Sequence, residues 1–169
     1  MHYAGIGRRT CPENIATICS KFAEKMETYK WTLRSGGAVG IDKAFEAGTK
    51  TKEIFKAGKA EAWAFDELKH CLPSYLKNVS TLASHIQNTL ARNMMIILGK
   101  HGDLPVSFVL CYTETMTAGG TSYGVRCAKR HDIPVFNLYD ADVLSLVETF
   151  LKVGENDFLS YQKVFKEML

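Results

Sequence analysis

The chain has 169 residues, which is enough for one well-formed hydrophobic core and argues against a second large domain. Hydrophobic residues make up 46% of the sequence and charged residues 23%, a balance typical of a folded globular protein and not of a disordered one. The formal net charge of +3 is too small to indicate nucleic-acid binding by itself.

The five cysteines are odd in number and show no CxxC spacing, so the sequence indicates neither a disulfide framework nor a zinc site, and no metal is expected. Free thiols are typical of a reducing compartment. The N-terminus has no basic-then-apolar leader, and no apolar run approaches the length of a membrane span. We therefore expect a cytoplasmic protein with no membrane partner.

The chain opens on a short segment, Met1–Ala4, that runs into Gly5-Ile6-Gly7-Arg8-Arg9. This pattern predicts a strand, a Gly-x-Gly turn and a helix that begins near Glu13. The glycines let a ligand approach the backbone without meeting a Cβ. Arginine suits a phosphate because its planar fork donates two hydrogen bonds at once. We expect at least one of Arg8 and Arg9 to face a ligand; the alternative is that both are solvated surface charges.

A second strand, glycine turn and helix follow. Trp31–Leu33 is typical of a buried strand, Ser35-Gly36-Gly37 forms the turn, and an amphipathic helix starts at Ile41. The backbone amides of such a turn, together with a helix N-terminus, can receive a phosphate. A tight turn without a ligand is the alternative. Asp42 falls in the first helical turn, where it either caps backbone amides or contacts a ribose hydroxyl.

The middle of the chain is less clearly patterned. Residues 49–59 are rich in lysine without interleaved aromatics, which predicts a solvated connection and not a nucleic-acid patch. Ala60–Phe65 predicts a third strand, and Asp66–Tyr75 a stretch rich in turns. A long helix is expected at Val79–Leu98, with the pair Arg92-Asn93 near the polar edge of its apolar stripe. A long side chain at that edge keeps its guanidinium available.

The clearest strand is Val106–Tyr112, whose continuous apolar run suits a central parallel strand covered on both faces. It breaks at Thr113 and Glu114, and Gly119-Gly120-Thr121 then opens a helix, which makes a third unit of strand, glycine turn and helix. Ile133–Leu138 predicts the last strand, and a further helix follows it.

Residues 1–152 are therefore predicted to form one α/β domain, a Rossmann-like parallel sheet with helices on both faces. Three glycine turns should converge at the carboxyl edge of that sheet, where such folds bind ligands. None of the turns is a complete GxGxxG fingerprint, which argues against an NAD dehydrogenase. Residues 153–169 predict an amphipathic helix that packs on the domain or on a partner subunit, and we expect a homo-oligomer.

Four segments, in their order and spacing, resemble the SLOG superfamily, which groups the DNA-processing protein DprA (Smf) with the Lonely Guy phosphoribohydrolases. They are residues 5–9, 34–42, 91–93, and 119–121 followed by Ile133-Pro134-Val135-Phe136. The short, single-domain DprA-like proteins often carried by bacteriophages are the most similar. The resemblance implies a SLOG-type fold with a nucleotide cleft that the Arg-Asn pair faces. The ligand-binding candidates are Gly5, Gly7, Arg8, Arg9, Ser35, Gly36, Gly37, Asp42, Arg92, Asn93, Thr113, Gly119, Gly120 and Thr121.

The sequence departs from both branches of the superfamily. Lonely Guy enzymes carry a catalytic glutamate in the motif Gly-Gly-x-Gly-Thr-x-x-Glu, whereas here Gly124 stands three places after Thr121. Glu114 is the nearby carboxylate that could replace this acid. Full-length DprA has flanking domains and a strongly basic DNA-binding face, and this sequence shows neither. The catalytic role is therefore left open, and an enzyme is less favoured than a binding protein.

Three functions compete. The favoured one is non-catalytic binding, or sequestration, of a nucleotide or nucleotide-derived signal, in an anti-defence role of a phage-type relative. The second is a Lonely Guy-like hydrolysis of nucleoside monophosphates, with Glu114 and Arg92 as the best available pair. The third is DprA-like binding of single-stranded DNA, which the modest charge and scattered lysines disfavour. No cofactor is expected.

Overall fold

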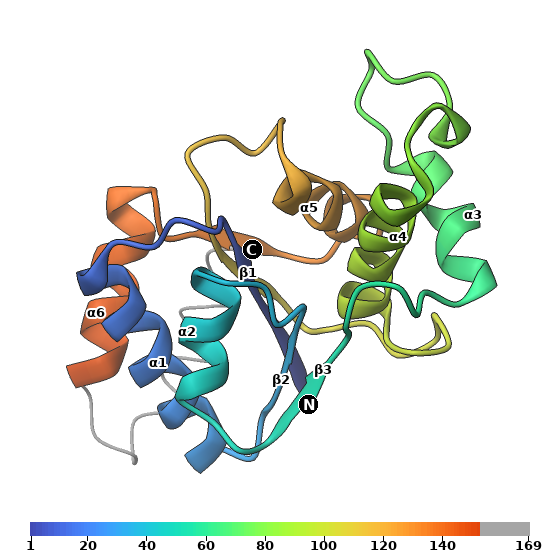
Figure 1. Cartoon of the computed structure of the whole chain (residues 1–169). Helices are drawn as coiled ribbons and strands as arrows, with labels where there is room; N and C mark the ends of the chain where they lie inside the picture. Colours follow the sequence, from blue (N-terminus) through green and yellow to red (C-terminus); the bar gives the residue numbers. More distant parts are fainter. Residues whose placement is uncertain (153–169) are drawn as a thin grey trace.

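The computed structural model describes residues 1–152, and the helix predicted at residues 153–169 lies outside the described residues. The described chain alternates between strands and helices for most of its length (Figure 1). The strands are β1 (His2–Gly7), β2 (Thr32–Ser35), β3 (Lys52–Ile54), β4 (Val109–Tyr112) and β5 (Val135–Asn137). The helices are α1 (Glu13–Thr28), α2 (Ile41–Ala47), α3 (Ala62–His70), α4 (Ser84–Leu98), α5 (Gly120–Arg130) and α6 (Ala141–Lys152), with a 3-10 turn, η1 (Val79–Thr81).

All five strands run parallel in the order β3-β2-β1-β4-β5. In β1, Ala4 pairs with Arg34 of β2 on one side and with Val109 of β4 on the other. The strand order reverses between β1 and β4, and such switch points are where open parallel sheets bind ligands. The prediction of a Rossmann-like parallel sheet with helices on both faces is confirmed.

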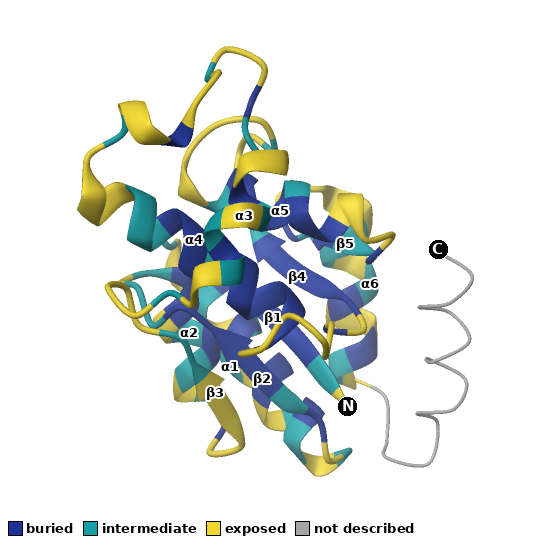
Figure 2. Cartoon of the chain, turned by 90° about the vertical axis from the view of Figure 1, so that its right-hand side faces the viewer, coloured by how far each residue is buried: buried dark blue, intermediate teal, exposed yellow. Residues whose placement is uncertain are grey.

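Two helical layers cover the sheet (Figure 1). The layer formed by α1, α2 and α6 buries an aromatic cluster around Phe22, in which Tyr3, Phe45 and Phe150 are also fully enclosed. The layer formed by α3, α4 and α5 buries mostly aliphatic and sulfur-containing side chains. Figure 2 shows β1, β2 and β4 as buried strands between these layers and β3 as a largely exposed edge.

The predictions for residues 49–70 are wrong in two places. The lysine-rich connection contains the edge strand β3, which the sequence hides because edge strands carry charged residues that discourage further pairing. The strand predicted at Ala60–Phe65 is instead the start of helix α3, which continues to His70, whereas the rest of the stretch expected to be rich in turns, residues 71–75, is not helical. Ala64 and Leu68 are its buried residues. Their spacing of four is helical, and the window that ended at Phe65 could not detect it.

The helix predicted at Val79–Leu98 is shorter than expected. Its first residues form η1, where the side chain of Asn78 accepts a hydrogen bond from the amide of Ser80, and α4 begins only at Ser84. A larger correction concerns Arg92, which was expected at the exposed edge of the helix. The Arg92 side chain is buried, with 6% of the residue exposed, because α4 lies under α3 and against α5 and the end of β2.

No helix among residues 1–152 is long and apolar enough to cross a membrane.

Candidate functional site

A cleft of about 360 Å³ opens at the carboxyl ends of β1 and β4, at the switch point of the sheet. Most of the predicted ligand-binding residues lie around it. The lining includes Gly7, Arg8, Arg9, Asp42, Arg92, Asn93, Thr113, Gly119, Gly120 and Thr121. The sequence therefore located most of the cleft wall, from five separate stretches of the chain.

The turn after β1 forms one wall of the cleft. The amide of Arg8 donates a hydrogen bond to the carbonyl of Tyr112 at 3.1 Å, which extends the pairing of β1 and β4 to the rim. The Arg8 guanidinium forms an ion pair with Glu114, which follows β4 on the far side of the cleft. Arg9 is exposed, and no ion pair is recorded for it among the described residues. The two arginines therefore differ: one is held by a carboxylate and the other is free to meet an anion.

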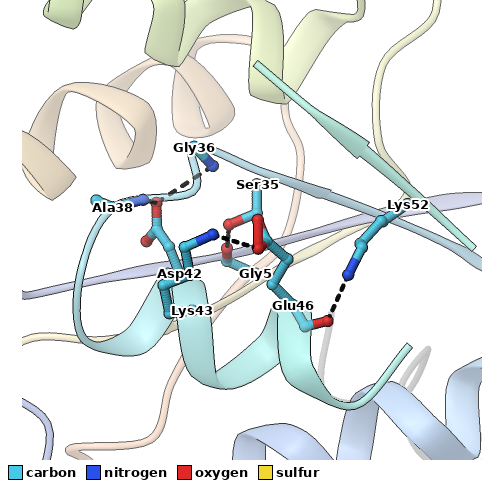
Figure 3. Close-up of polar contacts among 8 residues, drawn as sticks. All are labelled: Gly5, Ser35, Gly36, Ala38, Asp42, Lys43, Glu46 and Lys52. Carbon is cyan, nitrogen blue, oxygen red and sulfur yellow. Dashed lines mark hydrogen bonds and ion pairs between the residues drawn. The ribbon is translucent and has the colours of Figure 1, made fainter. Parts of the chain in front are cut away.

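Asp42 joins the first glycine turn to the second. Its Oδ1 accepts a hydrogen bond from the Gly7 amide at 3.1 Å. Its Oδ2 accepts from the amides of Gly36 at 3.2 Å and Ala38 at 3.3 Å (Figure 3). Burial raises the pKa of this carboxyl, although the three amide donors and the charge of Arg92 act in the opposite direction. Two roles were predicted for Asp42, capping backbone amides or contacting a ribose hydroxyl. The structure shows the capping of backbone amides.

Four predicted residues do not line the cleft: Gly5, Ser35, Gly36 and Gly37. Ser35 donates a hydrogen bond from its Oγ to the Gly5 carbonyl at 2.6 Å, so its hydroxyl joins β2 to β1 beneath the site (Figure 3). A Cβ at Gly5 would lie 2.6 Å from the Phe45 ring, because α2 packs directly on β1 there. Gly37 has a φ of +66°, a conformation that other residues rarely adopt. These residues shape the turns that carry the cleft.

Arg92 reaches the cleft from α4 beneath the second turn. Its Nη1 donates a hydrogen bond to the Phe55 carbonyl at 3.1 Å, and its buried Nε has no hydrogen-bond partner among the described residues. Burial lowers the pKa of the guanidinium, and the charge of Asp42 partly offsets this effect. Arg92 therefore holds the loop after β3 in place, and its Nε–H remains available as a hydrogen-bond donor beside the cleft.

The opposite wall is the start of α5. The side-chain amide of Asn93 donates a hydrogen bond to the Gly120 carbonyl at 3.0 Å and so fixes the first turn of this helix to α4. Gly119 has a φ of +79°, and a Cβ at Gly119 or Gly120 would meet no atom within 4 Å. The glycines here leave space above the helix N-terminus, where an anion is stabilised by free amides and the helix dipole.

Thr113 is buried at the end of β4, where its backbone is fixed by Asn137 of β5. The Thr113 amide donates to Asn137 Oδ1 at 3.1 Å, and Asn137 Nδ2 donates back to the Thr113 carbonyl at 2.8 Å. The Thr113 hydroxyl donates to the Thr115 carbonyl at 2.8 Å and bends the loop that leads to α5. Thr113 therefore positions the far wall of the cleft.

Sequence reasoning missed four residues of the lining: Ile6, Ala38, Thr89 and Ala118. Thr89 carried a usable signal, because it stands three and four places before Arg92 and Asn93 and so lies on the same helical face. The other three residues are small or apolar; Ile6 lines the cleft from the end of β1, and Ala38 and Ala118 line it from the loops that precede α2 and α5. Glu114 is not part of the lining.

No protein-family model matches the sequence, and no curated protein matches it either. The structure resembles that of DNA processing protein A from Helicobacter pylori, which was solved to explain a single-stranded DNA binding mode. The two superpose with a TM-score of 0.57 at 15% sequence identity, over 99% of this chain and 81% of the other. At this identity the likeness establishes the fold, and it confirms at that level the resemblance to DprA noted in the sequence.

Proposed function

We propose that the cleft binds the phosphate of a nucleotide unit without chemical conversion. The observation that carries this proposal is the convergence of two anion-binding elements on one cavity. The turn that bears Arg8 and Arg9 faces the glycine-lined start of α5 across the carboxyl edge of the sheet. Backbone amides, a helix N-terminus and arginine side chains are the groups with which proteins bind phosphate.

The size and openness of the cleft suit a ligand of this kind. Small-molecule sites are typically about 300–1,000 Å³, and this cleft falls at the lower end of that range. The empty space at Gly119 and Gly120 allows a phosphate oxygen to approach the backbone closely. Asp42 holds two of the surrounding turns in place before any ligand arrives. Sequestration of a signalling nucleotide by a phage-type protein would require nothing beyond such binding.

Hydrolysis has less support from the geometry. An N-glycosidic bond requires an acid beside the leaving base or a group that stabilises the oxocarbenium ion. Glu114, the candidate for that role, is exposed outside the cleft lining and pairs with Arg8. In the binding proposal Glu114 instead competes with the ligand for Arg8. The substitution Glu114→Gln separates the two ideas, because hydrolysis predicts loss of base release and binding predicts equal or tighter affinity.

Single-stranded DNA is a second candidate ligand, and the structural likeness to DNA processing protein A favours it. Arg92 donates a hydrogen bond to the carbonyl of Phe55. Phe55 also lines a second hollow, together with Lys56, Lys59 and Lys100. Lysines that continue from a phosphate site provide the kind of basic track that follows a nucleic-acid backbone.

Calorimetric titration with nucleoside monophosphates, cyclic nucleotides and ADP-ribosyl nucleotides, alongside an oligothymidylate, tests both candidates. We expect saturable binding of at least one of these ligands and a loss of affinity in Arg9→Ala. The matched control is Lys21→Ala, which removes an exposed cation of α1 that does not line the cleft, and this variant should bind like the unmodified protein. DNA binding should weaken steeply with salt and with shorter oligonucleotides. Absence of binding to the whole panel at low salt would overturn the proposed function.

A further inference from the structure

Four metal-binding side chains meet on the helical layer behind the cleft, where α3 packs against α5. Glu67 lies in α3 and Cys71 caps its C-terminus, and in the same way Cys127 lies in α5 and His131 caps its C-terminus. Each pair is spaced four residues apart, which places both members on the same face of a helix. Cys127 lies seven residues beyond Gly120, or about 10 Å along the helix at 1.5 Å per residue, so the cluster is separate from the nucleotide cleft.

The donor atoms are already close together. His131 Nε2 lies 2.9 Å from Glu67 Oε1, and Cys71 Sγ lies 3.8 Å from the same oxygen. The donor atoms of Glu67, Cys127 and His131 all lie within 4.8 Å of one another, and Cys71, which is outside this group of three, is joined to it through Glu67. In a tetrahedral zinc site, with bonds of about 2.0–2.3 Å, neighbouring donor atoms stand roughly 3.3–3.8 Å apart.

We propose that these side chains bind one Zn²⁺ ion. The ligand types are those zinc prefers: the Cys127 thiol, the His131 imidazole and the Glu67 carboxylate lie together, and the Cys71 thiol beside Glu67 is assigned as the fourth ligand. Cys71 and Cys127 are buried and Glu67 is mostly enclosed, whereas His131 is exposed at the edge and leaves a route for the ion. Arg130, whose Nε lies 3.2 Å from Glu67 Oε1, offsets the negative charge that two thiolates and a carboxylate would leave on the complex.

Binding is balanced by the release of two protons, one from each thiol, as the two S–Zn bonds form. The ion would exchange the hydrogen bonds within the cluster for bonds to the metal. Four protein ligands close the coordination sphere, which is the arrangement of a structural zinc site. Zinc would therefore fix the end of α3, and the long connection that starts at Cys71, to α5. The usual cysteine spacings do not reveal such a site, because each thiol pairs with a histidine or a glutamate at helical spacing.

The test starts from full-length protein that has been dialysed against a chelator and is then titrated with zinc in the presence of a chromophoric competitor. We expect one zinc per chain and a rise in the melting temperature, because an ion that binds only the folded state stabilises that state. Cobalt should give the absorption of a tetrahedral thiolate complex at the same stoichiometry. A protein that binds no zinc under these conditions has only an ion-pair and thiol cluster at this place, and the proposal is then wrong.

Variants assign the ligands. Cys127→Ser and His131→Gln should each weaken zinc binding by more than the roughly 10–100-fold that loss of an outer-shell partner costs. His131 is exposed, so His131→Gln should fold normally even where Cys127→Ser does not. His70→Gln is the matched control, an exposed histidine of α3 for which no contact with the cluster is recorded. A folded His131→Gln protein that binds zinc like the unmodified chain, or an equal loss in His70→Gln, would overturn the assignment.

Discussion

The guanidinium of Arg92 occupies the space that a side chain at Gly36 would need. A Cβ at Gly36 would lie 1.5 Å from Arg92 Nη1 and 2.8 Å from Asp42 Oδ2. The glycine of the second turn is therefore required by a buried arginine beneath it and not by a ligand above it. Gly36 after β2, Asp42 of α2 and Arg92 of α4 must therefore fit together for this turn to form.

The substitution Gly36→Ala should consequently destabilise the protein. The added methyl displaces the guanidinium from its hydrogen bond to Phe55, and overpacking of this kind costs about 1–3 kcal/mol or more. Chemical denaturation measures the loss. Gly120→Ala is the control, because its Cβ would enter open space and should change stability by no more than about 0.5 kcal/mol. Equal stability of the two variants would contradict the placement of Arg92.

Arg92→Ala should also lower stability, which differs from what an arginine at an exposed helix edge would do. The Phe55 carbonyl loses its donor and Asp42 loses a nearby positive charge. Loss of a hydrogen bond to a charged group costs about 1.5–3 kcal/mol. Arg92→Lys keeps the charge without the planar fork, so its stability should lie between that of the unmodified protein and that of Arg92→Ala. An unchanged melting temperature in Arg92→Ala, measured by calorimetry, would show that the side chain is not part of the fold.

The stability of the protein should depend on pH through the titration of Asp42. Burial raises its pKa in the folded protein, so between the ordinary aspartate value of about 3.9 and that raised value the folded state binds more protons than the unfolded state. The contribution of this group to stability is therefore present at low pH and is lost as the pH rises through the folded pKa. The stability of the unmodified protein minus that of Asp42→Asn should fall from pH 4 towards neutrality. A difference that increases with pH would show that the amide donors outweigh burial.

Self-association remains a prediction that rests on the sequence of residues 153–169. Phe158, Tyr161 and Phe165 fall on or near one face of the expected helix, which is more apolar area than a short exposed helix usually leaves in water. Light scattering of the full chain at micromolar concentration should give a mass above that of the monomer. A monomer mass across the concentration range would refute it.

The sequence predicted the repeated units of the fold well and the polar interior of the site poorly. Three strands followed by glycine turns were visible because apolar runs and glycines are local signals. Strand β3 was missed because Lys52 and Glu53 carry no apolar pattern at the sheet edge, and Glu53 instead pairs with the buried Arg34 at 2.7 Å. The burial of Arg92 could not be predicted, because it depends on α3 covering α4 and on the position of Asp42, which are contacts between distant segments.

The same limit applies to the glycines. Glycine at positions 5, 36 and 37 was interpreted as space for a ligand, whereas Phe45, Arg92 and Ile54 respectively lie where side chains would be. Among the glycines predicted to bind a ligand, Gly119 and Gly120 are the two at which the space is open. A glycine pattern indicates a close approach, but the sequence does not distinguish an approach by the protein's own atoms from an approach by a ligand.

The hydrogen bonds of Asp42 to both the first and the second turn constrain how the site can change over evolution. A mutation in either turn disturbs the other through one carboxylate, so most single changes there are costly and new specificities are slow to arise from that side. The loop between Thr113 and α5 is tied to the first turn at Glu114, by its ion pair with Arg8, whereas Thr117 and Ala118 further along the loop are exposed. Variation that accumulates at Thr117 and Ala118 would alter which base or sugar is accepted while the turns joined by Asp42 and the glycine-lined start of α5 stay fixed. Divergence among related proteins should therefore be concentrated in the exposed loop that precedes α5.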